Sequence, residues 1–196
     1  QQLGEVGTVL ASDTGDEGAW HSGKATHTLK DMSAAREVAV IAGGVGAARF
    51  LRAMRLSDTN HAVTALVNTG DDTVVNGLHV SPDIDTVIYT LANAIDPERG
   101  WGLSDETWVT MQSHARYVGV RPQHSTAAND WFNLGDRDMA THLYRTTRLA
   151  EGASLSEVTR EIAQAWNVPY TIVPMTDSRV ETRVTLADDA TSPDGH

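Results

Sequence analysis

The stretch VAVIAGGVGAARF, residues 38–50, constrains the fold of this chain more than any other. The apolar run from Val38 to Ile41 predicts a short buried strand, and the run from Ala47 to Met54 predicts a helix. The small residues between them leave backbone N–H groups free at a helix start, where the helix dipole favours an anion. The stretch therefore predicts a strand, an anion-binding turn and a helix, which together open an α/β fold.

Two common nucleotide-binding turns fit this loop poorly. A P-loop ends in Gly-Lys-Ser/Thr, whereas Gly46 is followed by two alanines, so a P-loop is excluded. A dinucleotide site has a glycine at the position of Arg49, and an acid closes its second strand where this chain has Asn68. NAD binding is therefore disfavoured. A tight strand-to-helix turn without a ligand remains the structural alternative.

Further predicted strands alternate with predicted helices. The strands span residues 61–68, 76–80, 130–134, 170–175 and 183–187, and the helices span residues 81–93, 104–119, 139–150 and 154–166. Ser81 is expected to cap the first of these helices, and Ser154 with Glu157 forms a capping box for the last. A core-facing stripe at helical spacing comprises Ile84, Val87, Ile88 and Leu91. The alternation predicts an α/β fold with a mostly parallel sheet and helices on both faces.

Acidic turns follow the predicted strands. They read NTGDD at residues 68–72, SPDID at 81–85, GDRD at 135–138 and TD at 176–177. Because parallel strands end at one edge of a sheet, we expect these turns to converge with the glycine loop. Carboxylates repel phosphate unless a cation intervenes, so the arrangement favours Mg²⁺, and the candidate ligands are Asp71, Asp72, Asp83 and Asp85. Arg137 in the GDRD turn could hold a substrate oxygen or phosphate as a rigid fork.

Composition excludes several function classes. The chain has 26 Asp and Glu against 15 Lys and Arg, which argues against binding to nucleic acid. It has no cysteine and no His pair spaced for zinc, and no apolar run is long enough for a membrane helix. A cytoplasmic protein is the expectation. Residues 1–31 are expected to be an unstructured tail or a gene-model extension. Trp101, Trp108 and Trp131 could stack on a planar ligand, although core packing is the commoner role.

Several long blocks occur in the same order as in a known family. They are AGGVGAARF, VNTGDD, GLHVSPDIDTVIYTLA, DPERGWGL, WFNLGDRDMATHLYRT, LSEVT and PMTD. Over about residues 38–186 the chain resembles the CofD family, the 2-phospho-L-lactate transferases of coenzyme F-420 biosynthesis. The resemblance implies a Rossmann-like three-layer fold and a homodimer in the full-length form. It also implies that residues 32–196 are the N-terminal part of a CofD-like transferase domain, truncated at its C-terminus.

The resemblance implies a Mg²⁺-dependent transfer of a substituted phosphate. The ribityl 5′-hydroxyl of the deazaflavin Fo attacks the β-phosphorus of a guanosine diphosphate diester, and GMP is released. The donor carries a lactyl or an enolpyruvyl group. The residues of the blocks DPERGWG and WFNLGDRDMATH resemble the actinobacterial branch of the family, whose donor carries enolpyruvyl. Two alternatives stay open: a nucleotide-binding regulatory protein with a CofD-like fold, and an NAD-dependent oxidoreductase.

The resemblance also assigns roles to residues of this chain. Gly43, Gly44 and Gly46 would cradle the donor phosphates, and Asp71, Asp72 and Asp85 would hold Mg²⁺ or the acceptor hydroxyl. The expected substrate contacts also include Asn68, Asp83, Asp136 and Asp138, and the expected catalytic residues are Asp72, Asp85 and Arg137. Asp85 is expected to orient or deprotonate the attacking hydroxyl. Asp85→Asn should then abolish GMP release while the protein stays folded.

Overall fold

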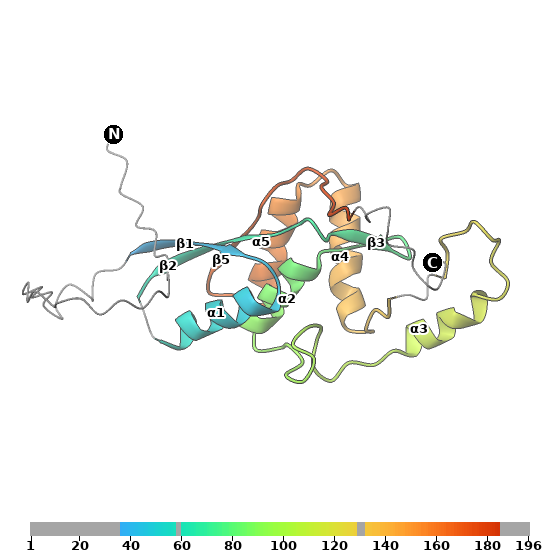
Figure 1. The fold of residues 1–196 in the computed structure, drawn as a ribbon, viewed down its shortest axis with the longest axis horizontal. Coiled ribbons are helices and arrows are strands. Elements are labelled where there is room, and N and C mark those ends of the chain that lie inside the picture. The colour runs from blue at the N-terminus through green and yellow to red at the C-terminus, as the bar shows by residue number, and fades with distance from the viewer. Residues whose placement is uncertain (1–35, 58–59, 129–131, 185–196) are drawn as a thin grey trace, which may run out of the picture. The chain divides into compact units, whose positions relative to one another are not determined.

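Three parallel strands form the central sheet, in the order β1-β2-β5 (Figure 1). They are β1 (Glu37–Ala42), β2 (Ala62–Val67) and β5 (Thr171–Pro174). Ala42 pairs in register with Val67, and Val67 with Pro174, so the chain leaves all three strands at one edge. The computed structural model describes residues 36–57, 60–128 and 132–184. The expected α/β class and parallel sheet are confirmed, whereas the expected tail at 1–31 lies outside the described residues.

Helices follow most of the strands. They are α1 (Val45–Leu56), α2 (Pro82–Leu91), α3 (Val109–His114), α4 (Asp138–Ala150) and α5 (Leu155–Ala165), with a 3-10 turn η2 (Ala115–Tyr117) after α3. The predicted capping box at the start of α5 is confirmed, because Ser154 and Glu157 bond to each other's backbone N–H groups. None of the helices in the described residues is long and apolar enough to cross a membrane.

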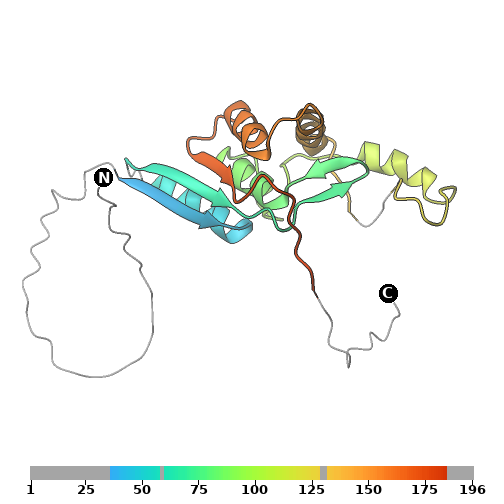
Figure 2. The same cartoon turned by 90° about the horizontal axis from the view of Figure 1, so that it is seen from above.

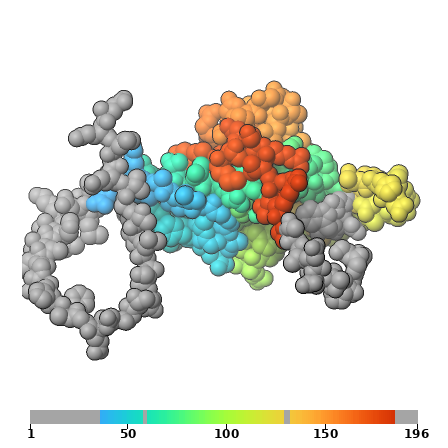
Figure 3. Space-filling view, turned by 45° about the horizontal axis from the view of Figure 1, so that its top comes forward, coloured from blue at the N-terminus to red at the C-terminus, as the bar shows by residue number. Residues whose placement is uncertain are grey.

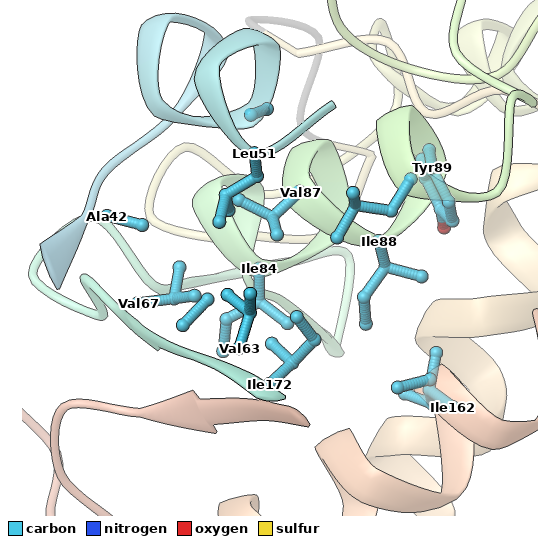
Figure 4. Packing of buried hydrophobic residues seen from close by; sticks show 14 of the residues in the cluster. Ala42, Leu51, Val63, Val67, Ile84, Val87, Ile88, Tyr89, Ile162 and Ile172 are labelled. Carbon is cyan, nitrogen blue, oxygen red and sulfur yellow. The ribbon is translucent and has the colours of Figure 1, made fainter. Parts of the chain in front are cut away.

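The buried core lies between the sheet and the helices (Figure 4). The predicted apolar stripe of α2 is confirmed, since Ile84, Val87, Ile88 and Leu91 are all fully buried. Leu51 from α1 and Val63 and Val67 from β2 belong to the same cluster (Figure 4). This burial holds α1 and α2 firmly behind the loops that leave the sheet.

The second face of the sheet is open in the described residues. Alternate side chains of β1 and β2 are exposed, and Ile41 is 88% exposed. In Figure 2, α1 (cyan) and α2 (green) lie behind the strands, and α4 and α5 (orange) lie beside them. The described residues therefore form two of the three expected layers, the sheet and the helices on one face.

The segment 73–80 forms an antiparallel hairpin that stands apart from the parallel sheet. It pairs β3 (Thr73–Val75) with β4 (Leu78–Val80). Asn76 and Gly77 connect the strands with φ angles of 51° and 83°, the left-handed conformation of a two-residue hairpin turn. The predicted strand at 76–80 was therefore partly wrong, because its first two residues form this turn.

Three other predicted elements differ from the structure. The helix expected at 104–119 begins only at Val109, because Asp105 has a φ of 52° and Glu106 binds a distant segment. No strand forms at 132–134 or 183–184, and the remaining residues of those two predicted strands lie outside the described residues. These segments contain apolar residues, but no described strand lies beside them to form backbone hydrogen bonds with them.

Candidate active site

The glycine loop lies between β1 and α1, against the carboxylate of Asp83. A Cβ added at Gly44 would stand 2.7 Å from Oδ1 of Asp83, and one at Gly43 would stand 3.7 Å from Oδ2. The side-chain amide of Asn68 donates to Oδ2 of Asp83 at 2.9 Å. The Oδ1 of Asn68 accepts from the N–H of Gly70 at 3.0 Å. The glycine loop, the turn after β2 and the start of α2 thus come together at this point. Glycine at position 44 makes the close approach of the Asp83 carboxylate possible.

An anion bound at the start of α1 would meet the charge of Asp83. The helix dipole attracts anions at this end, and Asp83 already supplies one. A phosphate placed beside it therefore requires a cation between the two negative groups. Gly46 differs from Gly43 and Gly44, because no described atom lies within 4 Å of a Cβ added there. Packing does not require glycine at position 46.

Asp72 faces a pocket of about 400 Å³. The pocket is lined by residues that include Thr69, Asp72, His79, Ser81, Arg145 and Asp177. Figure 3 shows the segment after β5, in red, between the orange helices and the green hairpin, where its residues line one side of the pocket. The pocket therefore lies next to the loop that connects β2 with the hairpin.

Among the described residues, one oxygen of Asp72 has no hydrogen-bond partner. Ser81 is the N-cap residue of α2, as predicted, but its hydroxyl donates to Oδ2 of Asp72 at 2.7 Å and makes no capping bond to the helix. Oδ1 is buried without a hydrogen-bond partner in the described residues, and so is Oγ1 of Thr69. Burial raises the pKa of Asp72 to about 6, although the Ser81 hydrogen bond and the charge of Arg145 act in the opposite direction. Asp72 can thus accept a hydrogen bond or a proton from a ligand in the pocket once the groups that cover Oδ1 move aside.

Three acids lie near one another at this edge of the sheet. Asp83 and Asp85 each contribute to the raised pKa of Asp72, so their negative charges repel. In the described part of the chain, no group of three or more His, Asp or Glu side chains is arranged to hold a metal. Mg²⁺ needs only one or two carboxylates when phosphate oxygens complete its shell, and Asp83 fits that requirement. Asp71 is exposed, and its expected role as a ligand stays a prediction.

Asp85 is fully paired inside the protein. Both of its oxygens accept from the guanidinium of Arg145, with 3.1 Å from Nη1 to Oδ2 and a second bond from Nη2 to Oδ1. Arg145 is completely buried, and its Nη1 also lies 3.4 Å from the carbonyl oxygen of His79. Burial would lower the pKa of Arg145, but the Asp85 carboxylate outweighs it and raises that pKa. The role of Asp85 as a base stays a prediction, and both of its oxygens already accept hydrogen bonds from Arg145.

The ion pair continues as a chain of polar contacts along α4. Nδ1 of His142 lies 3.2 Å from Nη1 of Arg145, and its Nε2 lies 3.1 Å from Oδ2 of Asp138. Tyr89 donates its hydroxyl to Oδ1 of Asp138 at 2.5 Å. Burial would raise the pKa of Asp138, but the contacts with His142 and Tyr89 outweigh it and lower that pKa. Asp138, an expected substrate contact, is therefore tied into the protein interior.

Asp136 caps the start of α3 from a distant position in the sequence. Its Oδ2 accepts from the Thr107 hydroxyl at 2.6 Å and from the N–H of Val109 at 2.8 Å. Its Oδ1 accepts from the N–H of Thr110 at 3.0 Å. These bonds lower the pKa of Asp136 to about 2, with the Thr107 hydroxyl as the largest cause. The expected contact of Asp136 with substrate stays a prediction, and its oxygens already have these partners.

Glu106 makes the reciprocal contact at the start of α4. Its carboxylate accepts from the N–H of Arg137 at 2.6 Å and from the N–H of Asp138 at 3.1 Å. A Cβ at Gly135 would overlap the Glu106 side chain, so this position needs glycine. The Arg137 guanidinium is exposed and donates to the carbonyl oxygen of Ser104 at 2.7 Å. The Glu106 carboxylate thus fixes the backbone of Arg137 and leaves the Arg137 side chain accessible from solvent.

Sequence reasoning missed Arg145, Glu106 and Tyr89, and it assigned no role to His142. One signal was present: Asp138, His142 and Arg145 recur at i, i+4 and i+7, which places three polar residues on one face of a predicted helix. A helix face of this kind needs polar partners if it packs inward. No comparable signal in the sequence connects Glu106 with residues 137 and 138.

The chain is similar to a known protein family and to curated proteins of mycobacteria. The family described as 2-phospho-L-lactate transferase CofD matches residues 38–195. The chain is 46% identical over 165 residues to the phosphoenolpyruvate transferase of Mycobacterium tuberculosis, a match that covers 78% of this chain and 47% of the relative. It is 44% identical over 163 residues to the phosphoenolpyruvate transferase of Mycobacterium ulcerans, with the same coverage of 78% and 47%. The chain spans about half the length of the curated relatives it matches.

A solved structure is also similar. It is the crystal structure of a UPF0052 family protein from Bacillus halodurans, with 16% sequence identity and a TM-score of 0.45. The match covers 74% of this chain and 40% of that chain.

Proposed function

Because the chain belongs to the CofD family, we propose that it forms part of a transferase of coenzyme F-420 biosynthesis. The enzyme would transfer a phosphoenolpyruvyl group from a guanosine diphosphate diester to the ribityl 5′-hydroxyl of Fo. The names of the mycobacterial relatives favour the enolpyruvyl donor over the lactyl donor. The full-length form is proposed to act as a homodimer.

The reaction makes one bond and breaks one. The oxygen of the 5′-hydroxyl bonds to the β-phosphorus, and the bond between that phosphorus and the oxygen bridging to the α-phosphate breaks. GMP leaves with the bridging oxygen, and the hydroxyl proton passes to a base. The protein must therefore hold two phosphates, position a hydroxyl and accept one proton.

The observation that carries the proposal is the unpartnered oxygen of Asp72 at the pocket. Oδ1 is buried without a partner in the described residues, while Ser81 holds Oδ2 at 2.7 Å and so fixes the orientation of the carboxylate. An acceptor hydroxyl in the pocket would donate to Oδ1 once the neighbouring groups that cover this oxygen move aside. A pKa of about 6 leaves Asp72 ionised at pH 7 and able to take the proton.

The glycine loop would hold the donor phosphates. Backbone N–H groups at the start of α1 favour their charge, and Asp83 lies against Gly44. Asp83 together with donor phosphate oxygens would hold Mg²⁺, with Asn68 fixing the position of the carboxylate. When bound, Mg²⁺ would offset negative charge on the phosphates during the transfer.

Arg137 and Arg145 would have different roles. The exposed guanidinium of Arg137 would turn from the carbonyl of Ser104 toward a substrate phosphate or oxygen, while the Glu106 carboxylate holds its backbone N–H in place. Arg145 is buried against Asp85 and would act as a positioning residue near Asp72, whose negative charge it stabilises. Asp85 would in turn hold Arg145 in place.

A transfer assay tests the proposal. The 196-residue chain is incubated with Fo, Mg²⁺ and the enolpyruvyl diester, and GMP release is measured, with the lactyl diester as a second donor. Asp72→Asn should lower the rate of GMP release by about 100-fold or more, the range expected for loss of a general base. Asp105→Asn is the matched control, because Asp105 is exposed and its positive φ suits asparagine. Equal rates for Asp72→Asn and the control would refute the assigned role of Asp72.

Binding titrations separate the proposal from its alternatives. Isothermal titration is carried out with Fo, with GDP plus Mg²⁺ and with NAD. Binding of Fo supports the transferase, and binding of nucleotide without Fo indicates the regulatory protein. Binding of NAD alone indicates the oxidoreductase.

A further inference from the structure

The loop at residues 94–104 is held by its own backbone. The N–H of Asp96 donates to the carbonyl of Gly102 at 3.0 Å, and the N–H of Ser104 donates to the carbonyl of Ala94 at 2.9 Å. Leu103 is buried in the main core and anchors the loop there. Gly100 has a φ of 77°, a left-handed conformation that glycine adopts without strain. The loop is therefore a fixed support for the side chains it carries.

Arg99 is fixed on this loop and lies over two tryptophans. Its Nε donates to Oδ2 of Asp96 at 2.9 Å, and its Nη2 donates to the carbonyl of Leu103 at 3.1 Å. The guanidinium carbon lies 5.1 Å from the ring centre of Trp101 and 5.3 Å from that of Trp108. Both distances are within cation–π range, so one arginine holds two indoles. We call Arg99, Trp101 and Trp108 the aromatic platform.

The two indoles of the platform are open to solvent. Trp101 is 44% exposed and Trp108 is 36% exposed, so neither is the core residue that the sequence favoured, and Trp131 lies outside the described residues. Trp101 also lies 6.3 Å from Phe132, ring centre to ring centre. Large aromatic surfaces that are both exposed and rigidly held are typical of binding sites, because little conformational entropy is lost when a ligand stacks on them.

The platform lies beside two parts of the proposed site. A Cβ added at Gly100 would stand 3.3 Å from Val45 and 3.3 Å from Arg49, so the loop packs on the first turns of α1, directly after the glycine loop. The carbonyl of Ser104, at the other end of the loop, accepts from Arg137. A ligand bound between the glycine loop and Arg137 is therefore next to the platform.

The size and charge of the platform fit a small flat ligand. At these exposures each indole presents roughly 100 Å² to solvent, whereas a stable protein interface buries about 800 Å² on each partner. The surroundings are charged, with Arg99, Asp96 and the exposed Asp105 nearby in the chain. Charged residues are depleted from the centre of protein interfaces, and stacking on an electron-rich indole favours a planar heteroaromatic ring.

We propose that the aromatic platform is the stacking site for the flat heteroaromatic ring of a substrate. The proposal rests on the proposed function, in which two substrates carry such a ring: guanine in the donor and the deazaflavin in the acceptor. Trp101 and Trp108 stack on the ring, and Arg99 keeps both indoles in place.

Substitutions at the two tryptophans test the site. Binding of GDP with Mg²⁺ and binding of Fo are measured separately for Trp101→Leu, Trp108→Leu and the unsubstituted chain. Stacking on one aromatic ring corresponds to an affinity loss of about 10- to 100-fold when the ring is removed. The ligand whose affinity falls identifies the ring that stacks. Trp101→Phe should restore much of the affinity, because it keeps an aromatic face.

The control is Phe50→Leu, since Phe50 is an exposed aromatic on α1 outside the platform. It should bind both ligands as tightly as the unsubstituted chain, and the ligand should quench tryptophan fluorescence in it as well. Unchanged affinity of both leucine variants for both ligands would overturn the stacking site and leave the proposed function standing. If the unsubstituted chain binds neither ligand, the proposed function fails and the stacking site fails with it.

Discussion

Asp72 and Asp85 lie near the same buried cation, Arg145, and have opposite surroundings. Asp85 has both oxygens bound to that guanidinium. Asp72 has one oxygen bound to Ser81 and one buried oxygen without a partner in the described residues. Both acids belong to acidic segments that the sequence marked as candidate sites. The hydrogen-bond partners of each oxygen, and not the sequence motif, therefore separate a structural carboxylate from a reactive one.

The two environments also have opposite energetic consequences. A buried ion pair is held because each charge compensates the other, so the loss of one partner leaves a charge without compensation. A partly buried carboxylate with a free oxygen is itself unfavourable, and a ligand that donates to it removes that penalty. Asp85 should therefore matter most for folding, and Asp72 most for binding and transfer.

The largest expected effect comes from removing Arg145. Arg145→Met leaves Asp85 buried without its cation, and we expect the free energy of unfolding to fall by about 3 to 5 kcal/mol. Asp85→Asn should lower the free energy of unfolding by a similar amount, because it leaves Arg145 unpaired. The sequence-based expectation was that this variant would stay folded and lose only its activity. Urea unfolding followed by circular dichroism measures both.

The double variant Asp85→Asn with Arg145→Met completes a cycle with these two single variants. Since it removes both charges together, it should lose less stability than the sum of the two single changes. A midpoint of urea unfolding that is unchanged in Arg145→Met would show that the pair does not stabilise the fold, and the contrast with Asp72 would be lost.

A smaller effect is expected at the far end of the polar chain. Tyr89→Phe removes the hydroxyl that donates to Asp138 and leaves Oδ1 of that acid without this donor, which costs about 1 to 2 kcal/mol. Tyr144→Phe is the matched control, because Tyr144 is exposed and donates to Glu161 at 2.8 Å. Its stability should hardly change. If both variants lose the same free energy of unfolding, burial of the hydrogen bond between Tyr89 and Asp138 does not increase its contribution to stability.

Local signals in the sequence were sufficient for much of the fold. The stripe on α2 follows from helical spacing, and the start of α5 follows from Ser154 and Glu157, because all the interacting groups lie within a few residues. The hairpin turn Asn76-Gly77 also carried a local signal, although the sequence-based prediction placed it inside a strand.

The site was predictable as a set of turns but not as a set of contacts. Asp72, Asp83 and Asn68 were chosen because acidic and amide residues follow strands. Arg145 and Asp85 are 60 residues apart, and Glu106 and Asp138 are 32 apart. Such pairs depend on how α2, α4 and the loop before α3 pack, which no local pattern specifies. The distinction between Asp72 and its exposed neighbour Asp71 likewise depends on burial by the hairpin and α4.

The last expected effect is the pH dependence of stability that Asp72 causes. Its pKa is about 6 in the folded protein against 3.8 for an ordinary exposed aspartate, so the folded state binds the proton more tightly. Stability from this group is full below pH 4 and is lost as the pH rises through about 6. Asp72→Asn cannot ionise, so its stability relative to the unsubstituted chain should increase between pH 4 and pH 7. The free energy of unfolding, measured without Mg²⁺ at four pH values in this range, gives the difference. Asp138 has a lowered pKa and acts in the opposite direction at lower pH, and it is common to both proteins. Parallel curves for the two proteins would mean that Asp72 is as well solvated as an ordinary surface acid, and its contrast with Asp85 would then reduce to the ion pair alone.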